Sequence, residues 1–144
     1  MMKKFFSILV GSLMISSAFA ATPPDIKGVW SGTTNDAIIG SGIYYSASSS
    51  PDQIRFLQLP ITYNITQQSG RNFSGEIQLG NKKFPMVGVF AADLVSGVFA
   101  EKGGTGTFAM AGSNQINFCW STSSTDPSNK AAGAVVSCHE LVKK

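Results

Sequence analysis

The sequence predicts an all-β protein: a single small antiparallel up-and-down barrel of about eight strands, preceded by a cleaved signal peptide. Apolar and polar residues alternate in short runs that are rich in β-branched and aromatic residues. Glycine and serine separate these runs, and no window has the apolar spacing of an amphipathic helix. Short strands joined by tight turns leave sheet edges exposed, and closure into a barrel removes those edges.

The N-terminus has the three regions of a secretory signal. Lys3 and Lys4 precede an apolar run over residues 5–15, and Ala18-Phe19-Ala20 forms a small-x-small cleavage site. The run is too short for a transmembrane helix, so no stable membrane insertion is expected. Ala21, and not cysteine, follows the cleavage site, so no lipid anchor is expected. We therefore predict a signal peptide over 1–20, a barrel domain over 21–144, and a periplasmic or secreted location.

Charge argues against nucleic acid as a partner. Two of the 11 basic residues lie in the signal peptide, which leaves nine against eight acidic residues. The nine are scattered and form no stripe that could follow a phosphate backbone.

The first part of the domain predicts two strands and a loop. Residues 26–34 form a strand that carries Trp30, and residues 37–46 form a looser one. Residues 46–52 have no apolar period and are dense in serine, proline and aspartate, so they form an exposed loop that could act as a mobile flap.

Residues 61–77 give the clearest hairpin. Ile61, Tyr63 and Ile65 share one face, and after the turn at Ser69-Gly70 the alternation resumes with Phe73. Further strands are predicted over 84–90, 95–101, 105–111, 116–122 and 135–142. This gives nine strands, of which one is merged or peripheral. Glycines within the strands suit the bends that closure requires, although two packed sheets remain an alternative.

The two cysteines, Cys119 and Cys138, predict a disulfide, because an even pair in an oxidising compartment is normally oxidised. Alternation places Ile116, Phe118 and Trp120 on the core face and Cys119 on the opposite face. If residues 135–142 pair with this strand, the disulfide seals the last hairpin.

Gly28-Val29-Trp30 resembles the Gly-x-Trp motif that opens lipocalins and avidins, in which the tryptophan lies across the closed end of the barrel. More of the chain resembles an uncharacterised family of small secreted bacterial proteins, through residues 28–33, 65–75, 87–89, 116–120 and 137–138. The resemblance implies a barrel and a cysteine pair, and it carries over no catalytic residue. The second and third lipocalin motifs are not evident and the biotin contacts of avidins cannot be placed, so biotin is not the expected ligand.

Catalytic groups are few, so we do not expect an enzyme. His139 is the sole histidine, and we expect it to be a strand residue near solvent or in a hydrogen bond. No Gly-x-Ser-x-Gly turn presents a serine nucleophile. The acidic residues are dispersed, so no metal and no cofactor is predicted.

The aromatic residues are the remaining functional candidates. They either fill the barrel or line a pocket at its open mouth beneath the loop at 46–52. The candidate ligand-binding residues are Trp30, Tyr63, Phe73, Phe118 and Trp120. Two hypotheses follow: a non-enzymatic binding barrel for a small apolar or amphipathic ligand, or a solid interaction or inhibitor module that contacts an envelope or secreted protein through residues 46–52 and 121–130.

Overall fold

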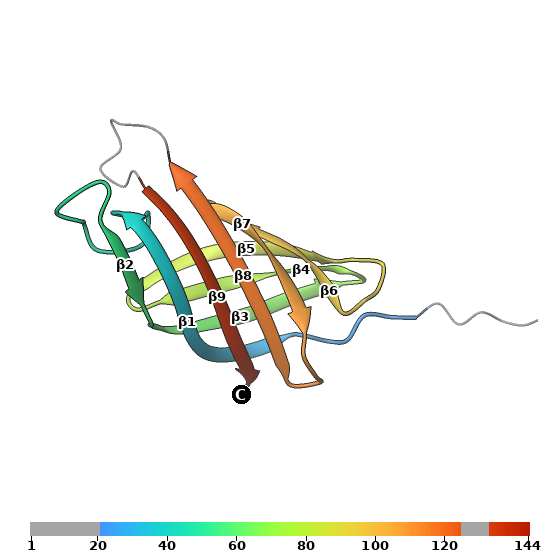
Figure 1. Cartoon of the computed structure of the whole chain (residues 1–144). Coiled ribbons are helices and arrows are strands. Elements are labelled where there is room, and N and C mark those ends of the chain that lie inside the picture. The colour runs from blue at the N-terminus through green and yellow to red at the C-terminus, as the bar shows by residue number, and fades with distance from the viewer. Residues whose placement is uncertain (1–20, 125–132) are drawn as a thin grey trace, which may run out of the picture.

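The computed structural model describes residues 21–124 and 133–144, so the predicted signal peptide lies outside the described residues. These residues form nine antiparallel strands in one sheet (Figure 1). The strands are β1 (Gly28–Gly40), β2 (Ile54–Leu57), β3 (Pro60–Ser69), β4 (Asn72–Leu79), β5 (Lys82–Phe90), β6 (Ser96–Glu101), β7 (Gly104–Met110), β8 (Gln115–Ser124) and β9 (Gly133–Lys143). No helix in this part of the chain is long and apolar enough to cross a membrane.

The sheet closes into a barrel, as predicted. Consecutive strands from β3 to β9 pair in order, and β9 then pairs with β1 along almost its whole length (Figure 1). The other edge of β1 pairs first with β3 and then with β2, in one continuous register. β2 is therefore an extra strand that extends the line of β3, and the barrel itself has eight strands.

The start of the domain differs from the prediction. Residues 26–34 and 37–46 were expected to form two strands, but β1 is a single strand through both, and residues 41–53 form the connection to β2. β1 stays extended because it has strand partners on both edges. The polar residues between Thr34 and Ala37 had indicated a break between two strands. β2 was not predicted, since four residues are too short to show a pattern.

The hairpin of β3 and β4 is confirmed. Ile61, Tyr63 and Ile65 point into the barrel and are buried, and Ile61 pairs with Leu79 in register. Gly70 occupies the turn with φ of 55°, a conformation that glycine adopts without strain. The register shifts between Ile65 and Gln67, which marks a bulge in β3.

One end of the barrel is closed by its own N-terminal segment. Trp30 is 1% exposed, and its indole Nε1 donates to the carbonyl oxygen of Ile26 at 2.8 Å. The Ile26 amide in turn donates to the side chain of Gln68, at the end of β3. The Lys143 ammonium lies 5.3 Å from the Trp30 ring centre. Trp30 thus plugs the end where the β3–β4 turn lies.

The part of the barrel near the β3–β4 turn is filled by phenylalanine rings. Phe73, Phe90 and Phe108 pack edge to face or tilted, with ring centres 5.0 to 5.8 Å apart. Gly88 admits the Phe73 ring, because a side chain at Gly88 would collide with that ring. The strand glycines expected to serve as bends thus also make room for aromatic side chains.

The disulfide is confirmed. Cys119 and Cys138 lie directly opposite each other on β8 and β9, with Cα atoms 4.1 Å apart, and both are exposed. Because β9 also pairs with β1, the bond fixes the strand that closes the barrel.

Candidate functional site

The other end of the barrel is the mouth, where residues 41–53 and the β4–β5 and β6–β7 turns meet. A small cavity of about 30 Å³ lies just inside it. It is lined by the rings of Tyr44, Tyr45, Tyr63, Phe84 and Trp120, by polar Thr34, Glu101 and His139, and by aliphatic side chains of β3 and β4. A space of this size accommodates about one water molecule.

The structure divides the five predicted ligand-binding residues between different places. Tyr63 and Trp120 line the mouth cavity. Phe118 lies deeper and stacks on Tyr63 with ring centres 4.5 Å apart. Trp30 plugs the closed end, and Phe73 belongs to the phenylalanine cluster near the same end.

Tyr44 lies in the segment that connects β1 to β2, and its side chain closes the mouth. Its ring centre lies 4.1 Å from that of Phe84 and 5.7 Å from that of Trp120. Its hydroxyl donates a short hydrogen bond to Glu101, which also accepts from the amide of Gly103 at 2.9 Å. Burial, and then the adjacent Glu101 carboxylate, raise the pKa of Tyr44 well above its usual value, so the phenol stays protonated and remains a donor.

Two polar atoms at this cavity have no partner in the described structure. The indole Nε1 of Trp120, a residue only 7% exposed, and the Oε1 atom of Glu101 are both buried and unbonded. A buried polar atom without a hydrogen bond costs about 1–3 kcal/mol. One donor and one acceptor at the wall of a single cavity therefore indicate a place where a water or a ligand completes the hydrogen bonding.

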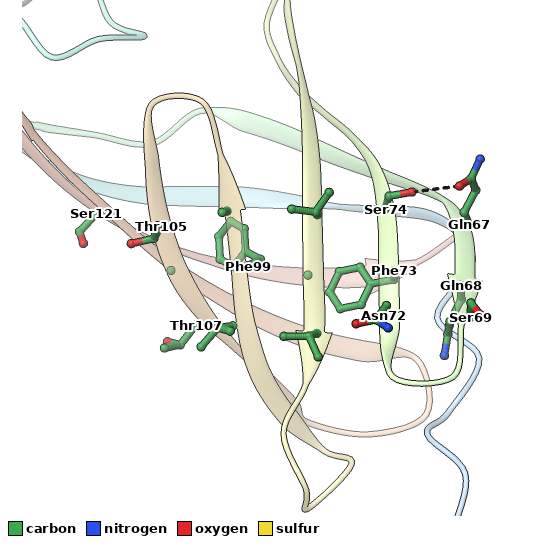
Figure 2. Close-up of a pocket in the computed structure, with 16 residues that line it drawn as sticks. Gln67, Gln68, Ser69, Asn72, Phe73, Ser74, Phe99, Thr105, Thr107 and Ser121 are labelled. Carbon is green, nitrogen blue, oxygen red and sulfur yellow. Dashed lines mark hydrogen bonds between the residues drawn. The ribbon is translucent and has the colours of Figure 1, made fainter.

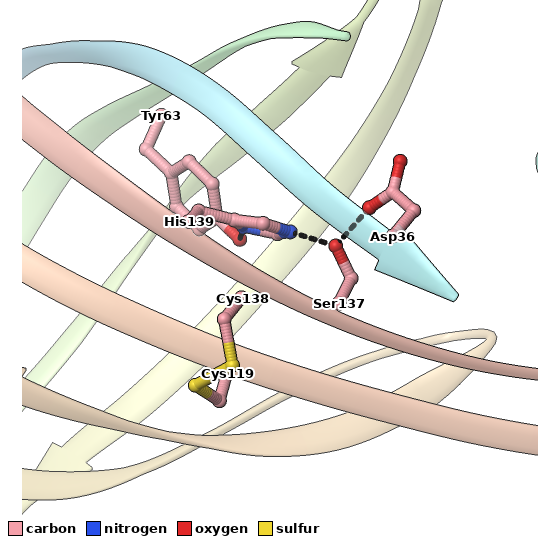
Figure 3. Close-up of a disulfide and its surroundings, with 6 residues drawn as sticks. All are labelled: Asp36, Tyr63, Cys119, Ser137, Cys138 and His139. Atoms are coloured by element: carbon pink, nitrogen blue, oxygen red, sulfur yellow. Dashed lines mark hydrogen bonds between the residues drawn. A yellow bond between two sulfur atoms is a disulfide. The ribbon is translucent and has the colours of Figure 1, made fainter. Parts of the chain in front are cut away.

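A buried chain of hydrogen bonds borders the site on the side of β1 and β9 (Figure 3). Asp36 accepts from Thr34 Oγ1 at 2.6 Å and from the Ser137 hydroxyl. Ser137 Oγ lies 2.7 Å from Nε2 of His139, and Nδ1 of His139 lies 2.9 Å from the Tyr63 hydroxyl. Since Ser137 donates to Asp36, His139 donates through Nε2 and accepts from Tyr63 through Nδ1. Every side chain in this chain then has a partner.

The order of these groups differs from that of a catalytic triad. In a triad the histidine accepts the serine proton and the carboxylate orients the histidine. Here the Ser137 hydroxyl donates a hydrogen bond to the Asp36 carboxylate, and His139 donates to Ser137. The chain therefore fixes the orientation of His139 and, through it, of the Tyr63 hydroxyl.

His139 is buried, with 5% of its surface exposed, so the expectation of a position near solvent was wrong, whereas that of a hydrogen bond was right. The reason is strand phase: Cys138 points outward, so its neighbour points inward. Burial lowers the pKa of His139 to about 4, although the nearby Asp36 charge opposes the shift.

This pKa shift makes stability depend on pH. The unfolded chain binds a proton on histidine near pH 6.5, whereas the folded chain resists protonation until about pH 4. Stability should therefore fall as the pH drops from about 6.5 towards 4. Between pH 7 and pH 5 we expect a loss of about 2 kcal/mol through His139 alone. Urea unfolding at both pH values measures how much unfolding free energy the natural protein and His139→Gln each lose.

Equal losses of stability between pH 7 and pH 5 in the natural protein and in His139→Gln would contradict this prediction. If His139→Gln does not fold, the imidazole signals of the natural protein can be followed by NMR, because it has one histidine. They should titrate near pH 4, and titration near 6.5 would be equally contradictory.

A second, larger hollow lies outside the barrel. It is an open groove of about 1020 Å³ that runs across β3 to β8 (Figure 2). Its walls are mainly serine, threonine, valine and glutamine, with no charged side chain. None of the buried unpaired atoms belongs to its lining residues. The small mouth cavity, and not this groove, is therefore the candidate site.

Sequence reasoning missed Asp36, Glu101 and Ser137 as site residues, and it did not select Tyr44 from the aromatic residues. A signal for two of them exists in the strand period. Carrying the alternation of β1 through Thr34 to Ile38 puts Asp36 on the core face, and the alternation of β9 does the same for Ser137. Polar residues at core-facing positions indicate a buried network.

Comparison of the chain with protein-family models, curated proteins and solved structures finds no match. The proposed function therefore rests on the geometry of the mouth.

Proposed function

We propose that this protein is an exported, non-enzymatic binding protein, a lipocalin-like or avidin-like barrel that takes a small ligand into its mouth. The observation that carries the proposal is the pair of buried, unpaired atoms at the mouth cavity, Trp120 Nε1 and Glu101 Oε1. The disulfide between Cys119 and Cys138 supports an oxidising compartment, either periplasmic or extracellular.

Binding requires the mouth to open. The cavity of about 30 Å³ is far smaller than the roughly 300 Å³ of a typical ligand pocket. Tyr44 occupies the remaining space, with its ring against Phe84 and its hydroxyl on Glu101. A ligand would displace this side chain and take over its contacts.

The segment that carries Tyr44, residues 41–53, is held by hydrogen bonds that include Ser48 N to Ser41 Oγ and Arg55 Nη1 to Ser46 Oγ. Besides the Tyr44 hydroxyl, Lys82 Nζ donates to the Tyr44 carbonyl oxygen at 2.9 Å, and Arg55 donates to the carbonyls of Gly40 and Ser41. Swinging the Tyr44 side chain away breaks one hydrogen bond and one aromatic cluster, a cost of about 2–3 kcal/mol. A cost of this size leaves about 1% of the molecules open, which is enough for a ligand to select.

Tyr44→Ala should strengthen binding, since it removes the side chain that competes with the ligand. Apparent affinity should rise by about 10- to 100-fold, because the open form no longer has to be populated at a cost. Native mass spectrometry of protein purified from its own compartment should show a co-purifying small molecule, at higher occupancy in Tyr44→Ala than in the natural protein. Ile43→Ala, a change of an exposed side chain on the same segment, is the control and should match the natural protein. Ligand-free spectra for all three proteins would contradict the proposal.

A second candidate, a protein-interaction module, is favoured by an exposed apolar patch. Phe56 and Ile54 on β2 are 77% and 65% exposed, and Phe56 lies in register with Ala37 and, across β1, with Val136. Among the described residues, the outer edge of β2 has no strand partner. An extended apolar segment of another protein could add to this edge. A protein that co-purifies in place of a small molecule would favour this candidate.

A further inference from the structure

We propose that the ligand of the mouth site is a small organic ammonium ion on a compact, preferably aromatic body, with its ammonium group on Glu101. This inference rests on the proposed function, because it names the chemistry that the opened mouth recognises.

The charges at the site favour a cation. Among the described residues that line the cavity, Glu101 is the only charged one, and none of them is lysine or arginine. His139 is neutral at pH 7 because burial holds its pKa at about 4. The second carboxylate, Asp36, is engaged by the hydroxyls of Thr34 and Ser137. An anionic ligand would find no positive partner there, whereas an ammonium group would find a partly unpaired carboxylate.

The remaining walls are aromatic. With the Tyr44 side chain displaced, the lining of the cavity keeps four aromatic rings together with Glu101, those of Tyr45, Tyr63, Phe84 and Trp120. Aromatic faces attract cations through their quadrupole, and an aromatic enclosure next to a carboxylate is suited to an ammonium group. A neutral polar ligand would gain neither interaction.

Tyr44 shows the size and layout of what the site accepts. Its flat ring lies between Phe84 and Trp120, and its hydroxyl donates to Glu101. A ligand that replaces it carries a ring in the same place and a donor at the carboxylate. Gly103 leaves room for that donor, because a side chain at Gly103 would collide with the Tyr44 hydroxyl.

The unpaired indole of Trp120 adds one requirement. Its Nε1 is a donor only, so the ligand should also carry an acceptor oxygen. Three matched compounds share a phenyl ring and a benzylic hydroxyl: 2-amino-1-phenylethanol, which is cationic at pH 7, 1-phenylethane-1,2-diol, which is neutral, and mandelate, which is anionic. They differ only in the group that would meet Glu101.

The test is calorimetric titration of the full mature chain carrying Tyr44→Ala with each compound at pH 7. The ammonium compound should bind about tenfold or more tightly than the diol, because its positive charge adds coulombic attraction to the hydrogen bond with Glu101, and mandelate should bind most weakly, because its carboxylate is repelled. Adding Glu101→Gln should remove the preference and bring the ammonium compound to the affinity of the diol. A cooperative thermal unfolding transition shows, independently of binding, that the Glu101→Gln variant is folded.

The possible failures can be told apart. Equal binding of all three compounds, or an ammonium preference that survives Glu101→Gln, overturns the ammonium inference and leaves the binding site standing. If none of the three binds while a small molecule still co-purifies from the native compartment, the ligand class is wrong and the proposed function stands. If none of the three compounds binds and the native mass spectra are also ligand-free, both the ammonium inference and the proposed function are overturned.

Discussion

Replacing Asp36 with alanine should destabilise the fold by about 4 kcal/mol, the largest loss that we expect from a single polar substitution. The carboxylate accepts hydrogen bonds from Thr34 and Ser137 inside the barrel, and 4% of its residue surface is exposed. Removal of a buried charged acceptor leaves both donors without a partner, at about 1–3 kcal/mol each. Ser137 would also lose its fixed orientation, which disturbs His139 and then Tyr63.

Urea unfolding at pH 7 measures this effect through the midpoint and slope of the transition. Asp52→Ala is the matched control, because Asp52 is exposed and its loss should change stability by less than about 0.5 kcal/mol. A loss below about 1 kcal/mol for Asp36→Ala would mean that the buried chain of hydrogen bonds contributes little to the fold.

Removing the disulfide by the double substitution Cys119→Ser and Cys138→Ser should cost about 3 kcal/mol. The cysteines are 19 positions apart in the chain. Opening a loop of this length returns that much conformational entropy to the unfolded state. The register of β8 and β9 extends on both sides of the pair, so the strands should still pair, and the loss should be one of stability and not of structure.

Thermal unfolding with and without a thiol reductant tests this prediction. The natural protein should lose about 10 °C in Tm on reduction, and the double variant should start near the reduced value and not respond to reductant. A natural protein whose Tm does not change on complete reduction would contradict the proposed role of the bond in holding the closing strand.

The local pattern was sufficient to predict most of the fold. Period-two alternation placed Ile61, Tyr63 and Ile65 inside the barrel and set the phase of the last two strands. It failed where long-range pairing overrides local composition. The polar residues that follow Thr34 suggest a break, yet pairing with β9 on one edge, and with β3 and then β2 on the other, keeps β1 extended.

The candidate site was only partly predictable for the same reason. Trp120 and Tyr63 were identified because alternation turns these aromatic residues inward, but it does not distinguish them from the three candidates that lie away from the mouth. Tyr44 and Glu101 meet across 57 positions of sequence, and Tyr44 lies in a connection whose path depends on tertiary contacts. The alternation of apolar and polar residues gives no sign of a contact between residues so far apart in the sequence.

The two tryptophans allow the most direct measurement of the mouth site. The chain has only Trp30 and Trp120, so a ¹⁵N-labelled sample gives two indole signals, and Trp120→Phe assigns them by removing one. In Tyr44→Ala, addition of 2-amino-1-phenylethanol should move the Trp120 signal as its free Nε1 gains an acceptor. The Trp30 signal at the closed end, already bonded to Ile26, should stay in place. A stationary Trp120 signal at saturating compound, or equal movement of both signals, would contradict a binding site at the mouth.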